Sequence, residues 1–285
     1  MRGVLAGDVT DLSPPPLRPV RASITPVVDR AESRKLEHDI RHALLHDGFA
    51  LAFQPRYLLS TRQPIGAEAL IRWPHRKRGL VSPALFIPVA EQSGLINDIG
   101  GWVLRQACRE AARWPSPAGI SVNVSARQLL DGVLIDQVTE ALALSSLDPE
   151  RLELEVTETV LLDISPDVLL TLAALNDIGV GLAIDDFGVG YTSLATLKRL
   201  PFTTMKIDRS MVRALPRDRE DAAIVCSLIA IAQALGLGVL AEGIETPEQE
   251  NFLIDVGCES GQGFLFSHAL SAEDIATCLT RPRPA

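Results

Sequence analysis

The chain has 285 residues, of which 47% are hydrophobic and 22% are charged, and its formal net charge is −9 at pH 7. This composition is typical of a globular protein with a large core, and the length suits one (β/α)8 barrel or two smaller domains. The acidic balance argues against a broad surface for duplex DNA or an anionic membrane. It leaves room for a small phosphate ligand held by metal ions and a few local cations.

The spacing of the cysteines and the length of the apolar runs bear on the cellular compartment of the protein. Cys108, Cys226, Cys258 and Cys278 lie far apart and form no CxxC pair, so we expect neither a zinc site nor a disulfide framework, but reduced thiols. The longest apolar run, residues 222–232, is too short to span a bilayer. The N-terminus lacks the apolar core of a signal peptide. We therefore expect a soluble, cytoplasmic protein with no membrane segment.

The first 30 residues are rich in proline and show little periodic pattern. We interpret residues 1–30 as a flexible tail or linker, and as a candidate contact for a regulatory partner. Residues 31–45 are charged but carry apolar side chains at helical spacing, which predicts an amphipathic lead-in helix. Residues 31–285 are expected to form one barrel domain.

From residue 50 onward, strand-like runs alternate with helical ones. The expected strands are 50–55, 65–73, 119–125, 151–157, 180–185, 203–208, 238–242 and 259–266, and helical patterns cover 102–114, 137–143, 168–177, 222–235 and 247–256. This alternation indicates βαβ units, and about eight of them favour a closed (β/α)8 barrel, TIM-like in architecture, over an open sheet. A short connection instead of a helix follows the first run, which hints at a hairpin and an antiparallel first strand.

The fifth run stops at two adjacent acids, Asp185 and Asp186, which precede Gly188 and Gly190. Neighbouring side chains of a strand point to opposite faces, so both acids can reach one pocket only if the strand ends there. The glycines permit such a break. Adjacent carboxylates repel each other unless a cation lies between them or one takes up a proton. The alternative is an N-cap, where Asp is common.

Polar side chains stand at or near the carboxyl end of every expected strand. In chain order they are Gln54; Glu68 and Arg72; Asn123; Glu155 and Glu158; Asp185 and Asp186; Lys206 and Asp208; Glu242 and Glu245; and Gln262. Buried strands rarely carry ionisable groups unless these are paired or bound, and a barrel gathers its carboxyl ends into one pocket. Such oxygen ligands suit Mg²⁺ or Mn²⁺ rather than zinc, and two bridged metal ions are a common device for phosphoester hydrolysis.

Single residues of this set allow other interpretations. Asn123 could start a helix, Glu158 could lie on a solvated turn, and Lys206 could be a surface lysine. Lys206 could also form a Schiff base, as in aldolase-type barrels, but that chemistry needs an apolar pocket. Because several acids are expected nearby, Lys206 more plausibly contacts the attacking water or a phosphate oxygen.

The segment Glu68-Ala69-Leu70-Ile71-Arg72-Trp73 resembles the EAL domain family, which takes its name from that tripeptide. Further blocks similar to the family's stand in the family's order at 53–55, 86–91, 122–125, 155–158, 185–188, 205–210, 241–246 and 262–267. Together they cover about residues 34–282. The resemblance implies a barrel with an antiparallel first strand. It also implies a phosphodiesterase that opens cyclic di-GMP to linear 5′-pGpG with Mg²⁺ or Mn²⁺.

The resemblance assigns a role to each matching position. It implies two metal ions bridged by one aspartate. It also implies that a glutamate at the second ion is the base for the attacking water and that Lys206 orients this water. The ligands of the first ion would be Glu68, Asn123, Glu155 and Asp185, and those around the second Asp185, Asp186 and Glu242, the last also being the candidate base.

The remaining matches concern substrate and assembly. Gln54 and Arg72 resemble substrate contacts, Arg72 on phosphate. Glu245 and Gln262 match positions that support substrate and the metal-and-water network. Glu158 is similar to the acid that anchors the loop 187–193, which in the family couples the site to dimerisation. We accordingly expect a homodimer through helices beside the fifth and sixth strands.

Two functions remain open at this stage. Every aligned site position keeps its chemistry, which favours an active enzyme; the alternative is a receptor that binds cyclic di-GMP without cutting it. Calcium is expected to inhibit, since it accepts looser geometry and polarises water less than Mg²⁺. Arg56-Tyr57, Val189 and His268-Ala269 depart from the family's usual residues.

Overall fold

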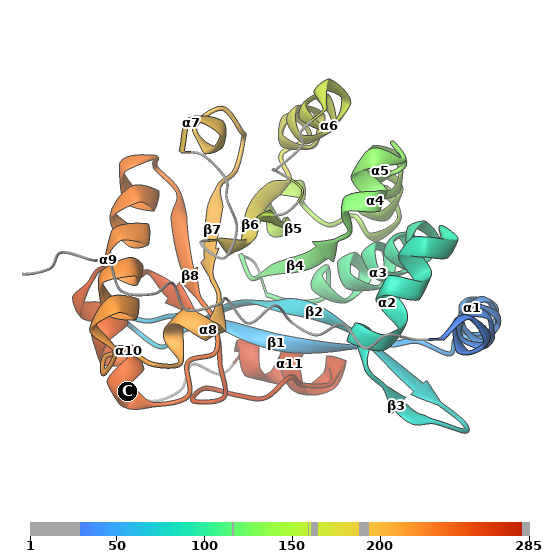
Figure 1. Cartoon of the computed structure of the whole chain (residues 1–285), viewed down its shortest axis with the longest axis horizontal. Helices are drawn as coiled ribbons and strands as arrows, with labels where there is room; N and C mark the ends of the chain where they lie inside the picture. Colours follow the sequence, from blue (N-terminus) through green and yellow to red (C-terminus); the bar gives the residue numbers. More distant parts are fainter. Residues whose placement is uncertain (1–28, 116, 159, 161–164, 188–193, 281–285) are drawn as a thin grey trace, which may run out of the picture.

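The computed structural model describes residues 29–115, 117–158, 160, 165–187 and 194–280 (Figure 1). Within this part of the chain, eight strands form a closed ring. Around the ring they run β1 (Ala50–Leu58), β9 (Ser260–Gly261), β8 (Gly238–Ala241), β7 (Thr204–Ile207), β6 (Gly181–Phe187), β5 (Leu152–Thr157), β4 (Gly119–Val124) and β2 (Pro64–His75), and β2 pairs with β1. A hairpin strand, β3 (Gly79–Val81), extends β2 outside the ring. The expected (β/α)8 barrel is confirmed.

The first strand runs against the others, as the short connection after it predicted. β1 is antiparallel to both β2 and β9, whereas the remaining ring pairs are parallel. In the β1–β2 register Gln54 stands opposite Glu68. The reversed strand therefore places a predicted substrate contact beside a predicted metal ligand.

Helices surround the ring and cover its apolar outer face (Figure 1). In the described residues they are α1 (Arg30–Leu45), α2 (Pro83–Ser93), α3 (Ile96–Ala111), α4 (Ala126–Leu130), α5 (Leu134–Ser145), α6 (Pro166–Asp177), α7 (Leu194–Leu197), α8 (Arg209–Val212), α9 (Arg219–Ala234), α10 (Pro247–Asp255) and α11 (Ala272–Thr280), with a 3₁₀ turn at Pro149–Arg151. None of these helices is long and apolar enough to cross a membrane.

The alternation of β5 shows how one strand serves both the core and the site. Leu152, Leu154 and Val156 are at most 1% exposed and belong to the hydrophobic core. Each such side chain contributes about 2 kcal/mol when it is fully buried. Glu153 and Glu155 alternate with them, so they point to the opposite face of the strand, into the barrel. The core thus fixes the direction in which the acids point.

Strand β6 corrects the expectation that the strand ends at Asp185. It continues to Phe187, but its pairing with β7 shifts register between Ile184 and Phe187. Asp186 has a φ of 56°, a left-handed conformation that non-glycine residues adopt rarely. An irregularity inside the strand, rather than its end, breaks the alternation at the two acids. Gly188 and Gly190 lie outside the described residues.

Two other boundaries differ from the expected ones. Helix α3 begins at Ile96 instead of residue 102, because Gly100 and Gly101 are helical; a Cβ on Gly100 would stand 2.0 Å from Nε2 of Gln128, so a larger residue would displace that amide. The last strand is short, because the chain turns after Gly261 and the backbone N–H of Ser267 donates to the carbonyl of Gly263. Helices α2 and α11 were not expected from the sequence.

Candidate active site

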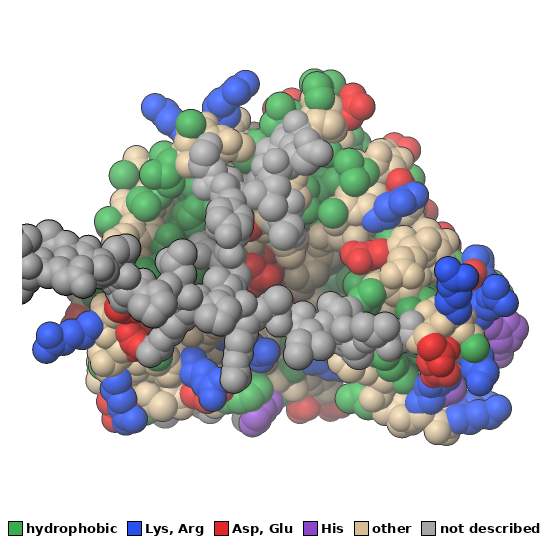
Figure 2. Space-filling view, viewed as in Figure 1, with side chains coloured by type: hydrophobic (Ala, Val, Ile, Leu, Met, Phe, Trp, Pro, Cys, Tyr) green, Lys and Arg blue, Asp and Glu red, His purple; other side chains and the backbone are tan. Residues whose placement is uncertain are grey.

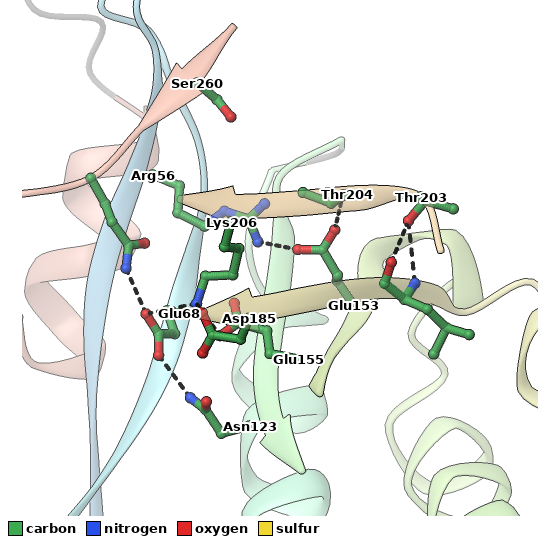
Figure 3. A network of polar contacts seen from close by, with 12 residues as sticks. Arg56, Glu68, Asn123, Glu153, Glu155, Asp185, Thr203, Thr204, Lys206 and Ser260 are labelled. Carbon is green, nitrogen blue, oxygen red and sulfur yellow. Dashed lines mark hydrogen bonds and ion pairs between the residues drawn. The ribbon is translucent and has the colours of Figure 1, made fainter. Parts of the chain in front are cut away.

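The ammonium group of Lys206 lies among carboxylates from four other strands or strand ends (Figure 3). Its Nζ is 2.5 Å from Oε2 of Glu155, 2.7 Å from Oε1 of Glu242, 3.2 Å from Oδ1 of Asp185 and 4.0 Å from Oε2 of Glu68. Lys206 and Glu155 are each 1% exposed. The barrel has therefore brought together the acids that the sequence placed at separate strand ends.

Two amide side chains hold Glu68 from either side. Nδ2 of Asn123 donates to Oε1 of Glu68 at 2.7 Å, and Nε2 of Gln262 donates to Oε2 at 2.6 Å. Gln262 also donates to Oε1 of Glu242 at 3.1 Å. These contacts join β2, β4 and the segments after β8 and β9 into one hydrogen-bonded network.

Crowding of the carboxylates changes their proton affinities. Burial, reinforced by the carboxylates of Glu68 and Asp185, raises the pKa of Glu155 to about 8 in spite of Lys206. Burial likewise raises the pKa of Glu242 to about 7. Burial would lower the pKa of Lys206, but the surrounding carboxylates outweigh it, so this pKa lies well above its ordinary value. Lys206 therefore keeps its positive charge at neutral pH.

Glu68 responds in the opposite direction. Burial alone would raise its pKa, but Lys206 and the amide donors of Gln262 and Asn123 outweigh burial, so the pKa of Glu68 is lowered. Glu68 is thus an anion at neutral pH, whereas Glu155 and Glu242 hold protons more readily. Different environments have separated three chemically identical groups.

Asp185 and Asp186 lie next to this network. The backbone N–H of Asp186 donates to Oδ1 of Asp185 at 3.0 Å. Partial burial and the neighbouring carboxylates of Asp185 and Asp208 raise the pKa of Asp186 to about 6. The carboxylates of the two adjacent acids are close enough to influence each other electrostatically, and a shared cation stays a prediction.

The predicted substrate contacts occupy the rim. Gln54, 7% exposed, donates its Nε2 to the carbonyl of Ser267 at 2.7 Å. Arg72 lines a cavity of about 530 Å³ together with Asn123, Ser125 and the apolar side chain of Ile87. Ser125 donates to Oε1 of Glu91 at 2.7 Å within the same wall. Arg72 thus shares a cavity wall with Asn123 of the cluster, and its contact with substrate stays a prediction.

In the part of the chain that the structure describes, the side chain of one predicted residue, Glu245, is not joined to the cluster. Glu245 is exposed, and among the described residues its side chain makes no hydrogen bond to the site; its backbone N–H donates to Gln249 at 2.7 Å. Glu158 is buried at 4% exposure. Because loop residues 188–193, including Val189, lie outside the described residues, loop anchoring by Glu158 stays a prediction.

A second layer of charge beneath the cluster was missed in the sequence. Arg56 of β1 contacts Glu153 of β5, with 2.6 Å between Nη1 and Oε1, and Thr204 of β7 donates to the other carboxylate oxygen at 2.6 Å (Figure 3). Burial would lower the pKa of Arg56, but the carboxylates of Glu153 and Glu155 outweigh it, so this pKa is raised. The sequence does contain a signal for Glu153, because it stands two residues before Glu155 and hence points to the same face of the strand.

The donor set of the cluster fits divalent metal ions. Among the described residues no group of three His, Cys, Asp or Glu side chains is placed to hold a metal ion, because the four carboxylates point toward Lys206. Yet Oε1 of Glu155 is buried without a hydrogen-bond partner, and a buried oxygen in that condition is costly unless something binds it. All ligands on offer are hard oxygens, which Mg²⁺ and Mn²⁺ prefer.

Comparisons with known proteins agree with this geometry. A family model of the EAL domain matches residues 37–269. The chain is 44% identical over 248 residues to the bifunctional diguanylate cyclase/cyclic di-GMP phosphodiesterase MucR of Pseudomonas aeruginosa, covering 86% of this chain and 36% of MucR. It is 41% identical over 249 residues to the cyclic di-GMP phosphodiesterase NbdA of the same organism, covering 86% of this chain and 32% of NbdA.

A solved structure of the PaMucR phosphodiesterase in complex with c-di-GMP matches the fold with a TM-score of 0.81 and 44% identity. That match covers 85% of this chain and 99% of the solved one. The chain spans about a third of the length of the two curated relatives, with 36% and 32% of their residues aligned.

Proposed function

The chain belongs to the EAL domain family, and from this premise we propose that it is a metal-dependent phosphodiesterase that hydrolyses cyclic di-GMP to linear 5′-pGpG. The observation that carries the proposal is the convergence of Glu68, Glu155, Asp185 and Glu242 on Lys206 inside one barrel. MucR and NbdA, both named as cyclic di-GMP phosphodiesterases, support the choice of substrate.

Two Mg²⁺ or Mn²⁺ ions would be held by the residues of the cluster. Glu68, Asn123, Glu155 and Asp185 would hold one ion, and Asp185, Asp186 and Glu242 would hold the other. For the first ion the amide of Asn123 would turn over so that its oxygen, rather than its Nδ2, faces Glu68. When bound, such ions polarise phosphate oxygens and make water a stronger nucleophile at neutral pH.

The side chains of the chain itself would orient substrate and move protons. Arg72 and Gln54 would hold the phosphate and sugar edge of the dinucleotide at the rim. Glu242 would accept a proton from the attacking water, because its carboxylate lies 2.7 Å from Nζ of Lys206, the group proposed to orient that water. The water oxygen bonds to phosphorus, the P–O3′ bond breaks, and the departing oxygen takes up a proton, which leaves a 5′-phosphate and a free 3′-hydroxyl.

Lys206 is better suited to this reaction than to Schiff-base chemistry. A Schiff-base lysine must be neutral to attack a carbonyl, whereas the carboxylates hold the pKa of Lys206 well above its ordinary value. As a charged donor, Lys206 would orient water and screen the repulsion between the acids. The absence of a borohydride-trapped adduct on Lys206 would agree with this role.

The proposal is tested by incubating the protein with cyclic di-GMP and Mn²⁺ and separating the nucleotides by chromatography. Glu68→Gln and Glu242→Gln should each lower turnover by about 10³-fold or more, since each removes a ligand or the base from the transition state. Glu273→Gln on the exposed surface of α11 is the matched control and should keep full activity. Turnover that persists in chelator would overturn the metal dependence.

The runner-up function is a receptor that binds cyclic di-GMP without cutting it. It predicts saturable binding with no product over hours, so the chromatography separates the two functions. Calcium provides a second test: it should reduce turnover when it replaces Mn²⁺, since it polarises water less. Full turnover in calcium would speak against the assigned chemistry.

We also propose a homodimer through the helices beside β6 and β7. Leu170 of α6 is 69% exposed and Leu194 at the start of α7 is 51% exposed, and a dimer contact at these helices would remove both apolar side chains from water. Light scattering after size exclusion should give twice the chain mass, and Leu170→Glu should give the monomer mass with an unchanged circular dichroism spectrum.

A further inference from the structure

A second cavity, of about 980 Å³, lies between helix α1 and the turn that joins β2 to β3, and it shares no lining residue with the acidic cluster. Figure 2 shows Lys, Arg and His side chains gathered at this edge of the molecule, over α1 and β3. The lining side chains of these three types are Arg34, Lys35, His38, His42, His46, His75, Arg76, Lys77 and Arg78. We name this cavity the basic groove.

The two walls of the basic groove present their positive groups to the same space. Arg34, His38 and His42 follow one another at four-residue intervals and form one row along α1, and His46 caps the end of the helix. The rings of His42 and His46 have centroids 4.3 Å apart. The opposite wall is the turn 75–78, where the backbone N–H groups of Lys77 and Arg78 both donate to Nδ1 of His75 and fix its shape.

Most of this charge is not neutralised within the protein. Arg78 forms ion pairs with Glu32 and Asp39, and Nε2 of His75 lies 3.4 Å from Oδ2 of Asp39. Arg34, Lys35, Arg76 and Lys77 form no ion pair with any described residue, and Asp47 is the other acid of the lining. A chain with a net charge of −9 therefore concentrates unpaired positive charge in one concave place.

The donors of the basic groove suit phosphate. Guanidinium, ammonium and imidazole N–H groups all donate hydrogen bonds, and the first two carry the charge that phosphate oxygens favour. Trp73 forms part of the lining but is only 1% exposed, edge-on to His75, so it offers no open ring on which a base could stack. The cavity is of small-molecule size. We propose that the basic groove binds a small anion that carries two or more phosphate groups, recognised through the phosphates.

A transition-metal site is the rival interpretation, because histidines four residues apart on a helix often bind metal. Two observations disfavour it. Among the described residues, no three His, Cys, Asp or Glu side chains are placed to hold a metal ion. The unpaired cations Arg34, Lys35, Arg76 and Lys77 would repel a dication but attract an anion.

The test is titration calorimetry of the whole protein with inorganic triphosphate in metal-free buffer, which keeps the acidic cluster from contributing. One site is expected, with an affinity that weakens as KCl screens the charges. The double variants Arg34→Ala/Lys35→Ala and Arg76→Ala/Lys77→Ala should each raise Kd about tenfold or more, the equivalent of about 1.4 kcal/mol. The matched control is Lys198→Ala/Arg199→Ala, an exposed basic pair next to α7, across the barrel from α1 (Figure 1); it should change Kd less than about twofold.

The outcomes separate the proposal from its rivals. ATP binding as tightly as inorganic triphosphate, with the same dependence on the groove residues, supports recognition through phosphates. Equal weakening by the groove and control variants would show non-specific attraction and overturn the proposal. So would binding of Zn²⁺ or of anionic lipid vesicles through these residues without affinity for triphosphate. Because all the substituted side chains are exposed, unchanged thermal melting should show that the variants fold, and none of these readouts depends on phosphodiesterase activity.

Discussion

Single residues decide how this barrel tolerates charge in its interior. The upper layer consists of acids around Lys206, and the layer beneath it consists of Arg56, Glu153 and Thr204. Breaking a buried pair by removing one partner costs more than the pair contributes, because the other charge is left alone. We therefore expect that removing either partner of the Arg56–Glu153 pair destabilises the folded protein by more than the pair itself contributes.

Arg56→Met should lower the free energy of unfolding by about 3 kcal/mol, since it leaves Glu153 without its cation. Arg56→Met/Glu153→Leu should cost less than the sum of its single substitutions. The control is Arg105→Met at the exposed pair with Glu140, which should cost less than about 1 kcal/mol. Urea unfolding measures all of them, and additive costs at the inner pair would refute the coupling.

The cysteines should differ in reactivity according to burial. Burial raises the pKa of Cys108 and of Cys258 to about 12, whereas Cys226 is exposed on α9. Only the thiolate reacts with iodoacetamide, and at pH 8 a thiol of pKa 12 stays protonated. Peptide mapping should find Cys226 modified first, with Cys108 and Cys258 modified after denaturation. Equal rates in the folded protein would contradict this assignment.

Much of the acidic cluster could be predicted from the sequence, because parallel strands deliver their carboxyl ends to one place whatever their loops do. Glu68, Asn123, Glu155, Asp185 and Glu242 follow from that rule alone. Its limits are equally physical. The rule says nothing of residues deeper in the barrel, such as Arg56, nor of the side-chain direction of a residue beyond a strand, such as Glu245.

At the scale of elements, the order of the ring strands and the presence of most of the longer helices between them were predictable, because buried strands and amphipathic helices have different periods; α2 and α11 were not expected. The irregular parts were not predictable. A register shift in β6 depends on its pairing with β7, and the helical Gly100 depends on Gln128 of α4. Such features are set by packing between elements, which local sequence does not encode.

The turn after β9 offers a test of such packing. A Cβ on Gly263 would stand 2.1 Å from the backbone oxygen of Ile244 and 2.3 Å from its nitrogen, and neither can move alone. Gly263→Ala should therefore cost about 3 kcal/mol of stability. It should also reduce turnover, because Gln262 would lose its place beside Glu68 and Glu242.

Gly181→Ala at the start of β6 is the matched control. Its new Cβ would meet nothing nearer than 3.5 Å, and alanine suits a strand better than glycine, so stability should stay the same or rise by up to about 1 kcal/mol. Thermal melting compares the two variants. Equal melting temperatures would show that the backbone near Ile244 yields more readily than its geometry indicates.

For the whole molecule, we expect the barrel to stay folded without its proposed metal ions. Lys206 already neutralises part of the acidic charge, so protein in chelator should keep its near-ultraviolet circular dichroism and melt cooperatively. Mn²⁺ at about 100 times its Kd should add roughly 2.7 kcal/mol, since it binds only the folded state. Loss of tertiary structure on chelation would contradict this expectation.

Lys206→Met separates the two sources of neutralisation. In chelator this variant should lose about 3–5 kcal/mol, because the buried acids lose the cation that contacts them directly. Mn²⁺ should recover part of that loss without restoring turnover. A variant as stable as the parent protein in chelator would mean that the acids accommodate one another by protonation alone.

The position of Lys206 among the acids should make folding of the protein independent of the metal ions that its proposed activity needs. Since the chain carries its own counter-ion, we expect newly made protein to fold in a metal-starved cell before any divalent ion binds. Under the proposed mechanism, its turnover would then follow the supply of divalent ions within the time of a binding step, with no new synthesis required.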